Sequence, residues 1–443
     1  MEEQLRQSFD ILCPSSGAQQ AAAADALQRP LRSRFQARLS ASVRLSTERT
    51  EYYWRSLVTT YRSGARVLVA VVSCLVLIGH LHRATGQEPP PGLEAVIDRV
   101  VQRFLVDNDI PGAAVGVVRD GKLIYAKGHG VRSVERQEPV VVNTLFQIGS
   151  VTKVFTTTLM LQLRDEGRLA LDDPVGKYLP AQVEMPSWSQ GEERVRPTLR
   201  HLATHRAGLP RNPPNRRDRP HSPSVMEPYS IAELYQGLAM TTLTSRPGTA
   251  VQYSNYGFGV LGHVLERATG QPYEALVHEK LLTPLAMVDT KISLTAGDLE
   301  RFAAHYWPKA KRVERERWVF GEVCAFAGLA STVPDLARFV AMHLGAQAGQ
   351  AAGPLRGSSV LEMRETVATF GTDEKRGITL GWFFTDHPKL GRILSHNGEV
   401  DGHSSSLWLA PQVDTAIIVL ANVGSDTAPR LKELIKVVVG YGP

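Results

Sequence analysis

A serine and a lysine three residues apart are the pair in this sequence whose types and spacing could do chemistry together. They lie in FQIGSVTKVFTT (residues 146–157), where Ser150 opens a predicted helix and Lys153 follows one turn later. On a helix these side chains share a face, beside the N–H groups and partial positive charge of its N-terminus. A buried, deprotonated amine can take the proton of a serine that attacks an acyl carbon. The pair indicates a nucleophile and its base, although an N-cap serine with a surface lysine has the same spacing.

Two later triplets could complete such a site. The triplet YSN (residues 253–255) falls in a turn-rich segment, where a phenol can share a proton with Lys153 and a carboxamide can bind a substrate amide. The triplet HNG (residues 396–398) lies on or beside a predicted strand, where glycine permits close approach of a substrate backbone. The competing triplets HLG (343–345) and KLG (389–391) end an apolar helix and occupy a turn, so we interpret them as chance matches.

Three other patterns match rival chemistries only in part. GFGVLG (257–262) has the glycines of a dinucleotide fingerprint, but no buried strand precedes it. HLATH (201–205) has the histidine spacing of a zinc helix but lacks the glutamate that a metalloprotease needs. GHSSS (402–406) approaches a nucleophile elbow but lacks the last glycine. We interpret them as helix-packing glycines, loop histidines and part of a strand.

The elements that must position the site are strands at both ends of the domain and helices between them. Apolar residues recur at helical spacing over 93–104, and two β-rich runs flank Asp120-Gly121, a hairpin signal. Further helices are expected over 150–167, 231–239 and 429–439, and strands over 378–384, 391–398, 404–411 and 414–423. This order predicts an α+β fold, in which an antiparallel β-sheet flanked by helices is built from both ends of the mature chain around a mostly helical inserted subdomain.

Composition argues against several classes of function. With 43% hydrophobic and 21% charged residues, the chain is typical of a soluble globular protein. Residues 1–66 hold ten Arg, no Lys and six acidic residues, so they carry +4 of the net charge of +6. The remainder is nearly neutral, and we expect no nucleic-acid partner. Cys324 is the one cysteine in the predicted domain, so we expect neither a disulfide within it nor a thiolate metal site.

The N-terminal part predicts export. Residues 1–60 form an Arg- and Ala-rich extension that we expect to be disordered. The apolar run over 67–79, within a leader at 61–86, is shorter than the roughly 20 residues of a membrane-crossing helix and fits a signal-peptide core. We expect translation to begin close to Arg66 and the product to be periplasmic or extracellular. The alternative is membrane attachment through residues 67–81. The domain itself would span 87–443, with an α/β part at about 93–160 and 325–443 and a helical part at about 161–324.

Several long blocks also occur in the order of one known family. Residues 93–440 resemble the serine β-lactamase and penicillin-binding protein superfamily, in particular its branch of class C β-lactamases, DD-peptidases and esterases. The resemblance is carried by HLATHRAGLP (201–210), PGTAVQYSNYGFGVLGHVLERATG (247–270), TPLAMVDT (283–290), GLASTVPDLARFVAMHL (328–344) and SHNGEVDGHSSSLWLAP (395–411). It implies a β-lactamase/transpeptidase-like fold with no metal and no organic cofactor.

Transferred residue by residue, the resemblance also implies a catalytic site. Ser150 would be the acylated nucleophile, Lys153 its proton partner and Tyr253 a base and acid. The backbone N–H groups of Ser150 and Glu399 would form the oxyanion hole. The substrate-binding residues would be Asn255, His396, Asn397 and Gly398.

Departures from the family pattern bear on the substrate. His396 stands where β-lactamases usually have a lysine, and a histidine is mostly uncharged near pH 7. Asn397 replaces the usual hydroxyl residue, and the common HTSG becomes HRAG at 205–208. We therefore expect an exported serine hydrolase that cleaves an amide or ester bond through an acyl-enzyme, with β-lactams or D-Ala-terminated peptides as the favoured substrates. A small-ester esterase and a non-catalytic binding protein on the same fold are the alternatives.

Overall fold

The computed structural model describes residues 92–215, 228–307, 317–345, 353–424 and 432–440. The expected extension, the leader and the apolar run over 67–81 lie outside these residues. Within the described ranges, no helix is both long enough and apolar enough to cross a membrane.

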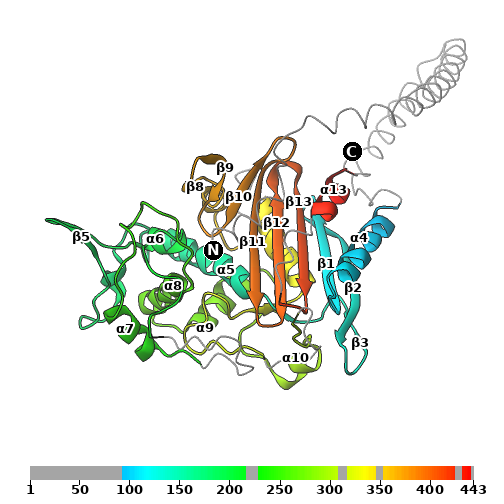
Figure 1. Cartoon of the computed structure of the whole chain (residues 1–443), viewed down its shortest axis with the longest axis horizontal. Coiled ribbons are helices and arrows are strands. Elements are labelled where there is room, and N and C mark those ends of the chain that lie inside the picture. Colours follow the sequence, from blue (N-terminus) through cyan, green and yellow to red (C-terminus); the bar gives the residue numbers. More distant parts are fainter. Residues whose placement is uncertain (1–91, 216–227, 308–316, 346–352, 425–431, 441–443) are drawn as a thin grey trace, which may run out of the picture. The chain divides into compact units, whose positions relative to one another are not determined.

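A nine-stranded antiparallel sheet forms the centre of the fold (Figure 1). Its strand order is β3-β2-β1-β13-β12-β11-β10-β9-β8. The N-terminal part supplies β1 (Gly112–Arg119), β2 (Lys122–Ser133) and β3 (Glu138–Pro139). The C-terminal part supplies β8 (Ala368–Phe370), β9 (Asp373–Ile378), β10 (Phe383–His387), β11 (Gly391–Val400), β12 (His403–Ala410) and β13 (Thr415–Ala421). Because β1 pairs with β13 from Ala113↔Ala421 to Arg119↔Thr415, the two ends of the domain meet inside the sheet, as predicted.

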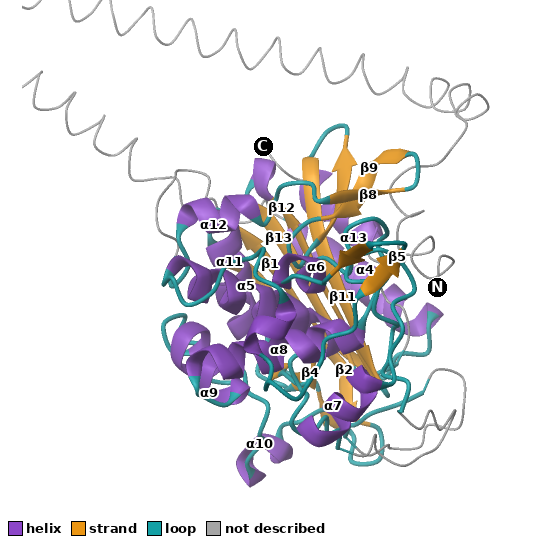
Figure 2. Ribbon diagram, turned by 90° about the vertical axis from the view of Figure 1, so that its left-hand side faces the viewer, coloured by secondary structure: helices purple, strands orange, loops and turns teal. Residues whose placement is uncertain are grey.

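The two faces of the sheet bury different layers of helices. Along β1, Ala113, Val115 and Val117 pack against α4 (Leu93–Asp107) and α13 (Lys432–Gly440). The alternate residues Ala114 and Val118 join the larger core on the other face, which includes α5 (Thr152–Asp165) and α11 (Val333–Leu344). This alternation follows from the two-residue period of a strand whose two faces are both covered. Figure 2 shows the strands between these helical layers.

The helical part gathers on the α5 side of the sheet, in green in Figure 1. Its helices are α6 (Leu199–Ala203), α7 (Ile231–Ala239), α8 (Asn255–Thr269), α9 (Tyr273–Val277) and α10 (Ala296–Glu300), and α12 (Gly357–Glu362) follows α11. Two small two-stranded sheets lie outside the main one: β4 (Phe146–Gln147) pairs with β7 (Ala330–Ser331), and β5 (Trp188–Gln190) pairs with β6 (Glu193–Val195). The predicted division into a sheet-bearing part and a helical insertion describes this arrangement, which confirms the expected fold class.

Local expectations were met at most elements and missed at one. Asp120 and Gly121 form the turn between β1 and β2 with φ of 50° and 69°, conformations that aspartate and glycine tolerate. The helix over 231–239 has the predicted bounds. The single strand expected over 378–384 is wrong: β9 ends at Ile378, β10 begins at Phe383, and the N–H of Thr379 donates to the carbonyl of Trp382 across the turn between them.

Candidate active site

Ser150 lies in a short 3-10 turn, Gly149–Val151, that leads directly into α5. Nζ of Lys153 donates a hydrogen bond of 3.0 Å to Oγ of Ser150 and another of 2.8 Å to the carbonyl of Phe326. Ser150 is partly exposed, whereas Lys153 is 0% exposed. The predicted pair is therefore in direct contact, with an accessible hydroxyl and a buried amine. The helix predicted over 150–167 ends two residues earlier, at Asp165.

The surroundings of Lys153 favour an uncharged amine. Burial, followed by the positive charge of Arg211, holds the pKa of its side chain well below the usual value. Three aromatic rings surround Nζ, with the centroids of Tyr253, Phe326 and Phe258 at 4.9, 5.5 and 5.7 Å. In the described part of the chain, no carboxylate forms an ion pair with this group. A neutral amine beside a serine hydroxyl can accept its proton.

Tyr253 completes a group of three side chains. Nζ of Lys153 lies 4.9 Å from the centroid of its ring. Burial raises the pKa of the phenol to about 12, against the opposing effects of the Ser150 side chain and of the charge of Arg211. At neutral pH the phenol is therefore protonated and able to donate a proton. The structure brings Ser150, Lys153 and Tyr253 together, as the sequence predicted.

Ser254 fixes the position of Tyr253 because it is the N-cap of α8. Its Oγ accepts a hydrogen bond from the N–H of Gly257 at 2.8 Å and donates to the carbonyl of Pro210 at 2.7 Å. Its own N–H donates to Nδ1 of His205 at 3.0 Å. The His205 ring also packs against Tyr253, with 4.3 Å between centroids. His205 is thus a buried positioning residue for Tyr253, beyond the loop role that its sequence context indicated.

The other side of the site is β11, whose backbone packs on the turn that carries Ser150. A Cβ added at Gly398 would lie 1.9 Å from the carbonyl oxygen of Ile148, so only glycine fits there. Gly149, with φ of 49°, also approaches β11 closely, because an added Cβ would lie 2.8 Å from the amide nitrogen of Glu399. The backbone amides of Ser150 and Glu399 therefore belong to segments in direct contact, as an oxyanion hole requires.

His396 and Asn397 offer different chemistry from the amine and phenol opposite. The His396 ring is 3% exposed, and its Nδ1–H donates to the carbonyl of Asn397 at 2.8 Å. Burial, and then the charge of Lys153, lower the pKa of His396 to about 3, so the ring is neutral at pH 7. The side-chain oxygen of Asn397 is buried and has no hydrogen-bond partner among the described residues.

Asn255 also presents an open acceptor. Its Nδ2 donates to Oδ1 of Asn212 at 3.4 Å, whereas its own Oδ1 is buried without a partner among the described residues. A buried polar atom without a partner costs free energy, on the order of 1–3 kcal/mol. A substrate N–H group could satisfy this oxygen, in keeping with the amide-binding role that the resemblance implies.

Two arginines that the sequence could not place lie near the site. Arg206, from HRAG, is half-buried and donates to the carbonyls of Val367, at 3.4 Å, and Gly248. Arg211 is exposed, and its guanidinium carbon lies 5.2 Å from the centroid of the Tyr253 ring. Nothing in RNPPNRRDRP (211–220) distinguishes this arginine from its neighbours, so no sequence pattern pointed to it.

The rival patterns have structural explanations. GFGVLG lies inside α8, where added Cβ atoms at Gly259 and Gly262 would meet Val323 and Ala325 at 2.4 and 2.2 Å. In HLATH, α6 ends at Ala203, before the second histidine. GHSSS leads into β12 with no turn to a helix. The packing interpretation of the glycines and the strand interpretation of GHSSS are confirmed.

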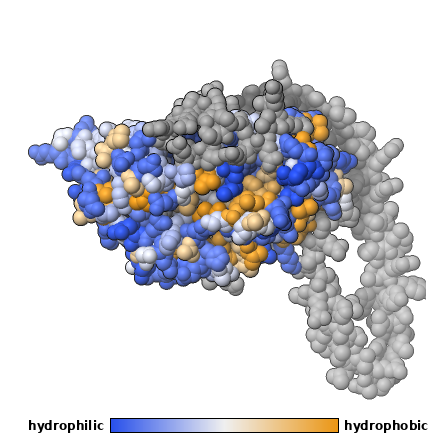
Figure 3. Space-filling view, turned by 90° about the horizontal axis from the view of Figure 1, so that it is seen from below, coloured by the Kyte–Doolittle hydropathy of each residue, from blue (hydrophilic) through white to orange (hydrophobic). Residues whose placement is uncertain are grey.

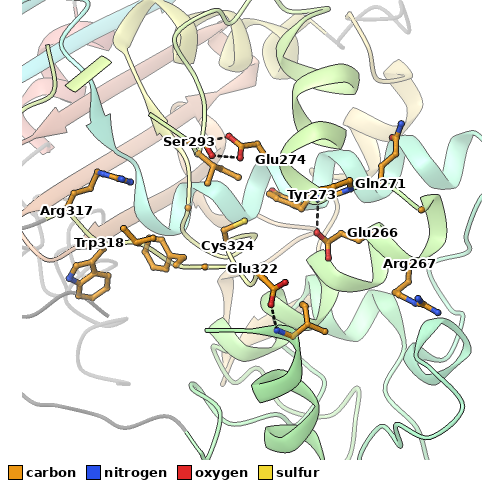
Figure 4. A pocket seen from close by; sticks show the side chains of 18 residues that line it. Glu266, Arg267, Gln271, Tyr273, Glu274, Ser293, Arg317, Trp318, Glu322 and Cys324 are labelled. Atoms are coloured by element: carbon orange, nitrogen blue, oxygen red, sulfur yellow. Dashed lines mark hydrogen bonds between the residues drawn. The ribbon is translucent and has the colours of Figure 1, made fainter. Parts of the chain in front are cut away.

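A separate pocket of about 630 Å³ lies between α8, α9 and the segment from Arg317 to Gly328 (Figure 4). None of the predicted site residues lines it. Its carboxylates are engaged within the protein: Glu266 accepts from the N–H of Tyr273, Glu274 from Ser293, and Glu322 from the N–H of Ile231. Burial raises the pKa of the Cys324 thiol to about 12. This pocket offers no activated nucleophile, so we place no reaction there.

Comparison with known sequences agrees with the residues gathered around Ser150. A family model described as Beta-lactamase matches residues 97–439. Protein flp of Staphylococcus aureus (strain N315) is 26% identical over 345 residues, which cover 76% of this chain and 64% of flp. The match thus spans less than two thirds of that relative. A Pseudomonas fluorescens protein described as Beta-lactamase is 28% identical over 343 residues, which cover 76% of this chain and 87% of that protein.

Comparison with solved structures shows the same fold. The chain is similar to the β-lactamase/D-alanine carboxypeptidase from Pseudomonas syringae, with a TM-score of 0.67 and 21% sequence identity. The alignment covers 80% of this chain and 100% of that one. At this identity the likeness establishes the architecture, and the substrate has to be argued from the site itself.

Proposed function

The chain belongs to the beta-lactamase family of serine hydrolases, and we propose that it is an exported enzyme that cleaves β-lactams or D-Ala-terminated peptides through an acyl-enzyme on Ser150. One observation carries this proposal: the buried amine of Lys153 lies 3.0 Å from the Ser150 hydroxyl. A purely structural role would not explain why a buried lysine is held uncharged beside an accessible hydroxyl. A role as general base would explain it, since only the neutral amine can accept a proton.

The proposed acylation divides the proton transfers between two groups. As Oγ of Ser150 forms its bond to the carbonyl carbon, its proton passes to Nζ of Lys153. The resulting oxyanion accepts hydrogen bonds from the N–H groups of Ser150 and Glu399. The carbon–nitrogen bond then breaks while the leaving nitrogen takes a proton from the Tyr253 hydroxyl, which the Lys153 ammonium replaces. The raised pKa of Tyr253 supports this role as a donor in preference to the role of first base.

Deacylation returns the enzyme to its starting state. A water molecule adds to the acyl carbon and gives its proton to the Lys153 amine. When the carbon–oxygen bond to Ser150 breaks, Oγ recovers a proton and the product leaves as a carboxylic acid. The same groups serve both half-reactions, so no metal or organic cofactor enters the proposal.

The open acceptors support an amide substrate. Oδ1 of Asn255 and Oδ1 of Asn397 are both buried without partners among the described residues. A peptide or a β-lactam with an acylamino side chain supplies N–H groups that a simple ester lacks, and a site built for such hydrogen bonds discriminates strongly.

A small-ester esterase is the second candidate, and one observation favours it. His396 is neutral at pH 7, so the strand that usually offers a cation to the substrate carboxylate offers none here. A site without that cation would suit neutral esters as well as it suits anionic peptides.

Acylation and turnover assays test the proposal. The protein would be incubated with a penicillin and its intact mass measured, beside turnover of nitrocefin, a D-Ala–D-Ala peptide and p-nitrophenyl acetate. We expect a mass increase equal to one penicillin in the parent and none in Ser150→Ala. A Ser150→Ala protein as active as the parent would refute the assignment, and a parent that is neither acylated nor active would favour a binding protein. Sequencing the N-terminus of the native precursor tests the expected start of translation close to Arg66, since a product that carries residues 1–60 would contradict it.

A further inference from the structure

The loop before Arg211 is fastened to the residues that carry Tyr253. The N–H groups of Asn255 and Tyr256 donate to the carbonyl of Arg211 at 2.9 and 3.1 Å. One residue earlier, the carbonyl of Pro210 accepts from Oγ of Ser254 at 2.7 Å. These bonds fix the backbone of Arg211 against the first turn of α8, so its place beside Tyr253 is set by the fold.

The Arg211 side chain lies beside the Tyr253 ring and has no partner of opposite charge among the described residues. The guanidinium carbon lies 5.2 Å from the centroid of the Tyr253 ring, within the range of a cation–π contact. The side chain is exposed, and within the described ranges it forms no ion pair or hydrogen bond. Its charge nevertheless acts on Tyr253, Lys153 and His205. An ordered and unpaired arginine in such a place is suited to a carboxylate, which its planar fork binds with two hydrogen bonds.

Two other basic groups around the hydroxyl have lowered pKa values. Burial keeps the pKa of His396 near 3 and that of Lys153 well below its usual value. Arg206, another arginine near the site, is half-buried and already donates to two backbone carbonyls. Among the described residues, Arg211 is therefore the exposed guanidinium that an anionic substrate would meet at Tyr253.

We propose that Arg211 binds a carboxylate on the leaving group of the substrate, and that it makes the site selective for anionic leaving groups. The leaving-group side follows from the neighbour of Arg211, because Tyr253 is the proposed proton donor to the departing atom. Arg211 thus supplies a positive charge for the substrate from the loop before α8, whereas the neutral His396 on β11 supplies none. The inference rests on the proposed function, since it names the substrate of the same site and decides between its two candidates.

A matched pair of esters tests the inference without assuming a peptide substrate. The anionic member is 4-acetoxybenzoate and the neutral member is 4-acetoxybenzamide, which share an acyl group and differ in the charge of the leaving group. We expect the parent to favour the anion in kcat/KM by about 10–100-fold, the range of a charge-assisted hydrogen-bonded pair. Arg211→Gln should abolish that preference mainly by lowering kcat/KM for the anion, and Arg211→Lys should keep part of it. Arg99→Gln, which removes an exposed charge on α4, should leave both values unchanged.

The outcomes separate this inference from the function on which it rests. If both esters acylate Ser150 in the intact-mass measurement but the parent shows no preference, the role of Arg211 is refuted and the hydrolase remains. If Arg211→Gln lowers both values equally and moves the pH profile, Arg211 acts only through Lys153 and the inference is wrong. If neither ester acylates the parent, the proposed function fails and the inference fails with it. Unfolding curves for each variant confirm that the compared proteins are folded.

Discussion

The two sides of the site carry different kinds of chemical group. The helix wall, which we define as residues 149–153 and 253–255, places the Lys153 amine in contact with the Ser150 hydroxyl and the Tyr253 ring beside that amine. The strand wall, residues 396–399, offers a neutral histidine, a carboxamide oxygen without a partner among the described residues, and a glycine pressed against the carbonyl of Ile148. The first wall is arranged for proton transfer and the second for shape and hydrogen bonding.

This difference shows how the fold separates reactivity from recognition. Reactive groups stand at two helix beginnings, where side chains one turn apart meet and backbone N–H groups are unpaired. The recognition groups of the strand wall stand on a strand in the middle of a paired sheet, where the backbone position is set by neighbours on both sides. Substitution of Ser150, Lys153 or Tyr253 should therefore remove the reaction, and substitution of Asn255 or of the strand wall should change its geometry or its choice of substrate.

The largest expected effect comes from removing the proposed base. Lys153→Met keeps the length and burial of the side chain but has no amine, so turnover should fall by about 1,000-fold or more. The free energy of unfolding should change by only about 1 kcal/mol, because the lost hydrogen bonds are offset by the burial of an apolar side chain. Steady-state kinetics and denaturant unfolding measure the two quantities.

A matched lysine serves as the control for that experiment. Lys280→Met removes an amine that lies 2.8 Å from Oε1 of Glu166, outside the site, and its turnover should equal that of the parent. If Lys153→Met keeps more than a tenth of the activity, the helix wall does not contain the base and the contrast between the walls is lost.

The second-largest effect on activity should come from the contact between Gly398 of the strand wall and the backbone that leads into the Ser150 turn. An added Cβ at Gly398 would lie 1.9 Å from the carbonyl oxygen of Ile148. Because this oxygen belongs to the backbone, a side-chain rotation cannot relieve the clash. Gly398→Ala should therefore shift β11 from the Ser150 turn, lower kcat by about 100-fold and destabilise the fold by about 1–3 kcal/mol. Gly297→Ala in α10, where an added Cβ has nothing within 4 Å, is the control and should change neither quantity. Unchanged kinetics in Gly398→Ala would show that the oxyanion position does not depend on this contact.

These two predictions show which part of the site could be read from the sequence. Ser150 and Lys153 are one helical turn apart, and Tyr253 is carried by a short motif, so local spacing was enough to find them. His205 was assigned to a loop because its role depends on a hydrogen bond from Ser254, forty-nine residues away. Arg211 was missed because several arginines follow one another there, and only the fold shows which of them lies over Tyr253.

The fold shows the same division between local and distant information. The β-rich run before Asp120 and the hairpin at Asp120 are properties of neighbouring residues, and the structure contains both. The run ITLGWFF was read as one strand because it is almost wholly apolar, so its hydrophobicity contains no sign of a turn. Gly381, at φ of 79°, is the residue that permits the chain to turn between β9 and β10.

A smaller effect should separate amides from esters at the two carboxamides. Asn255→Ala and Asn397→Ala each remove a buried acceptor that a substrate N–H would use. We expect kcat/KM to fall by about 10–100-fold for an acetyl-D-Ala–D-Ala substrate, which corresponds to about 1.4–3 kcal/mol. For p-nitrophenyl acetate, which has no N–H, the fall should be only about 2-fold.

The control for this comparison is Asn143→Ala, at an exposed position, which should leave both substrates unaffected. Equal losses on the two substrates would contradict the assignment, because a role in holding Tyr253 or the sheet would not depend on the substrate. A loss limited to Asn255 would place amide recognition on the helix wall alone.

The smallest effect concerns stability and tests whether His396 is uncharged. Its pKa in the folded protein is about 3, against an ordinary value of 6.5, because burial and the nearby Lys153 disfavour the charged ring more than the bond to the Asn397 carbonyl favours it. Between these two values the unfolded chain binds a proton that the folded chain does not, so stability is lost as the pH falls from 6.5 towards 3.

His396→Gln should reduce that loss by up to about 1.4 kcal/mol per pH unit between pH 6 and 4. His343 in α11, also with a pKa of about 3, should give a similar change when replaced by Gln, although it lies outside the site. Unfolding in urea at a series of pH values measures the slopes. If His396→Gln leaves the slope unchanged, the ring titrates near its ordinary pKa of 6.5 in the folded protein. The strand wall would then carry, at acidic pH, a cation for an anionic substrate, a role that we have assigned to Arg211.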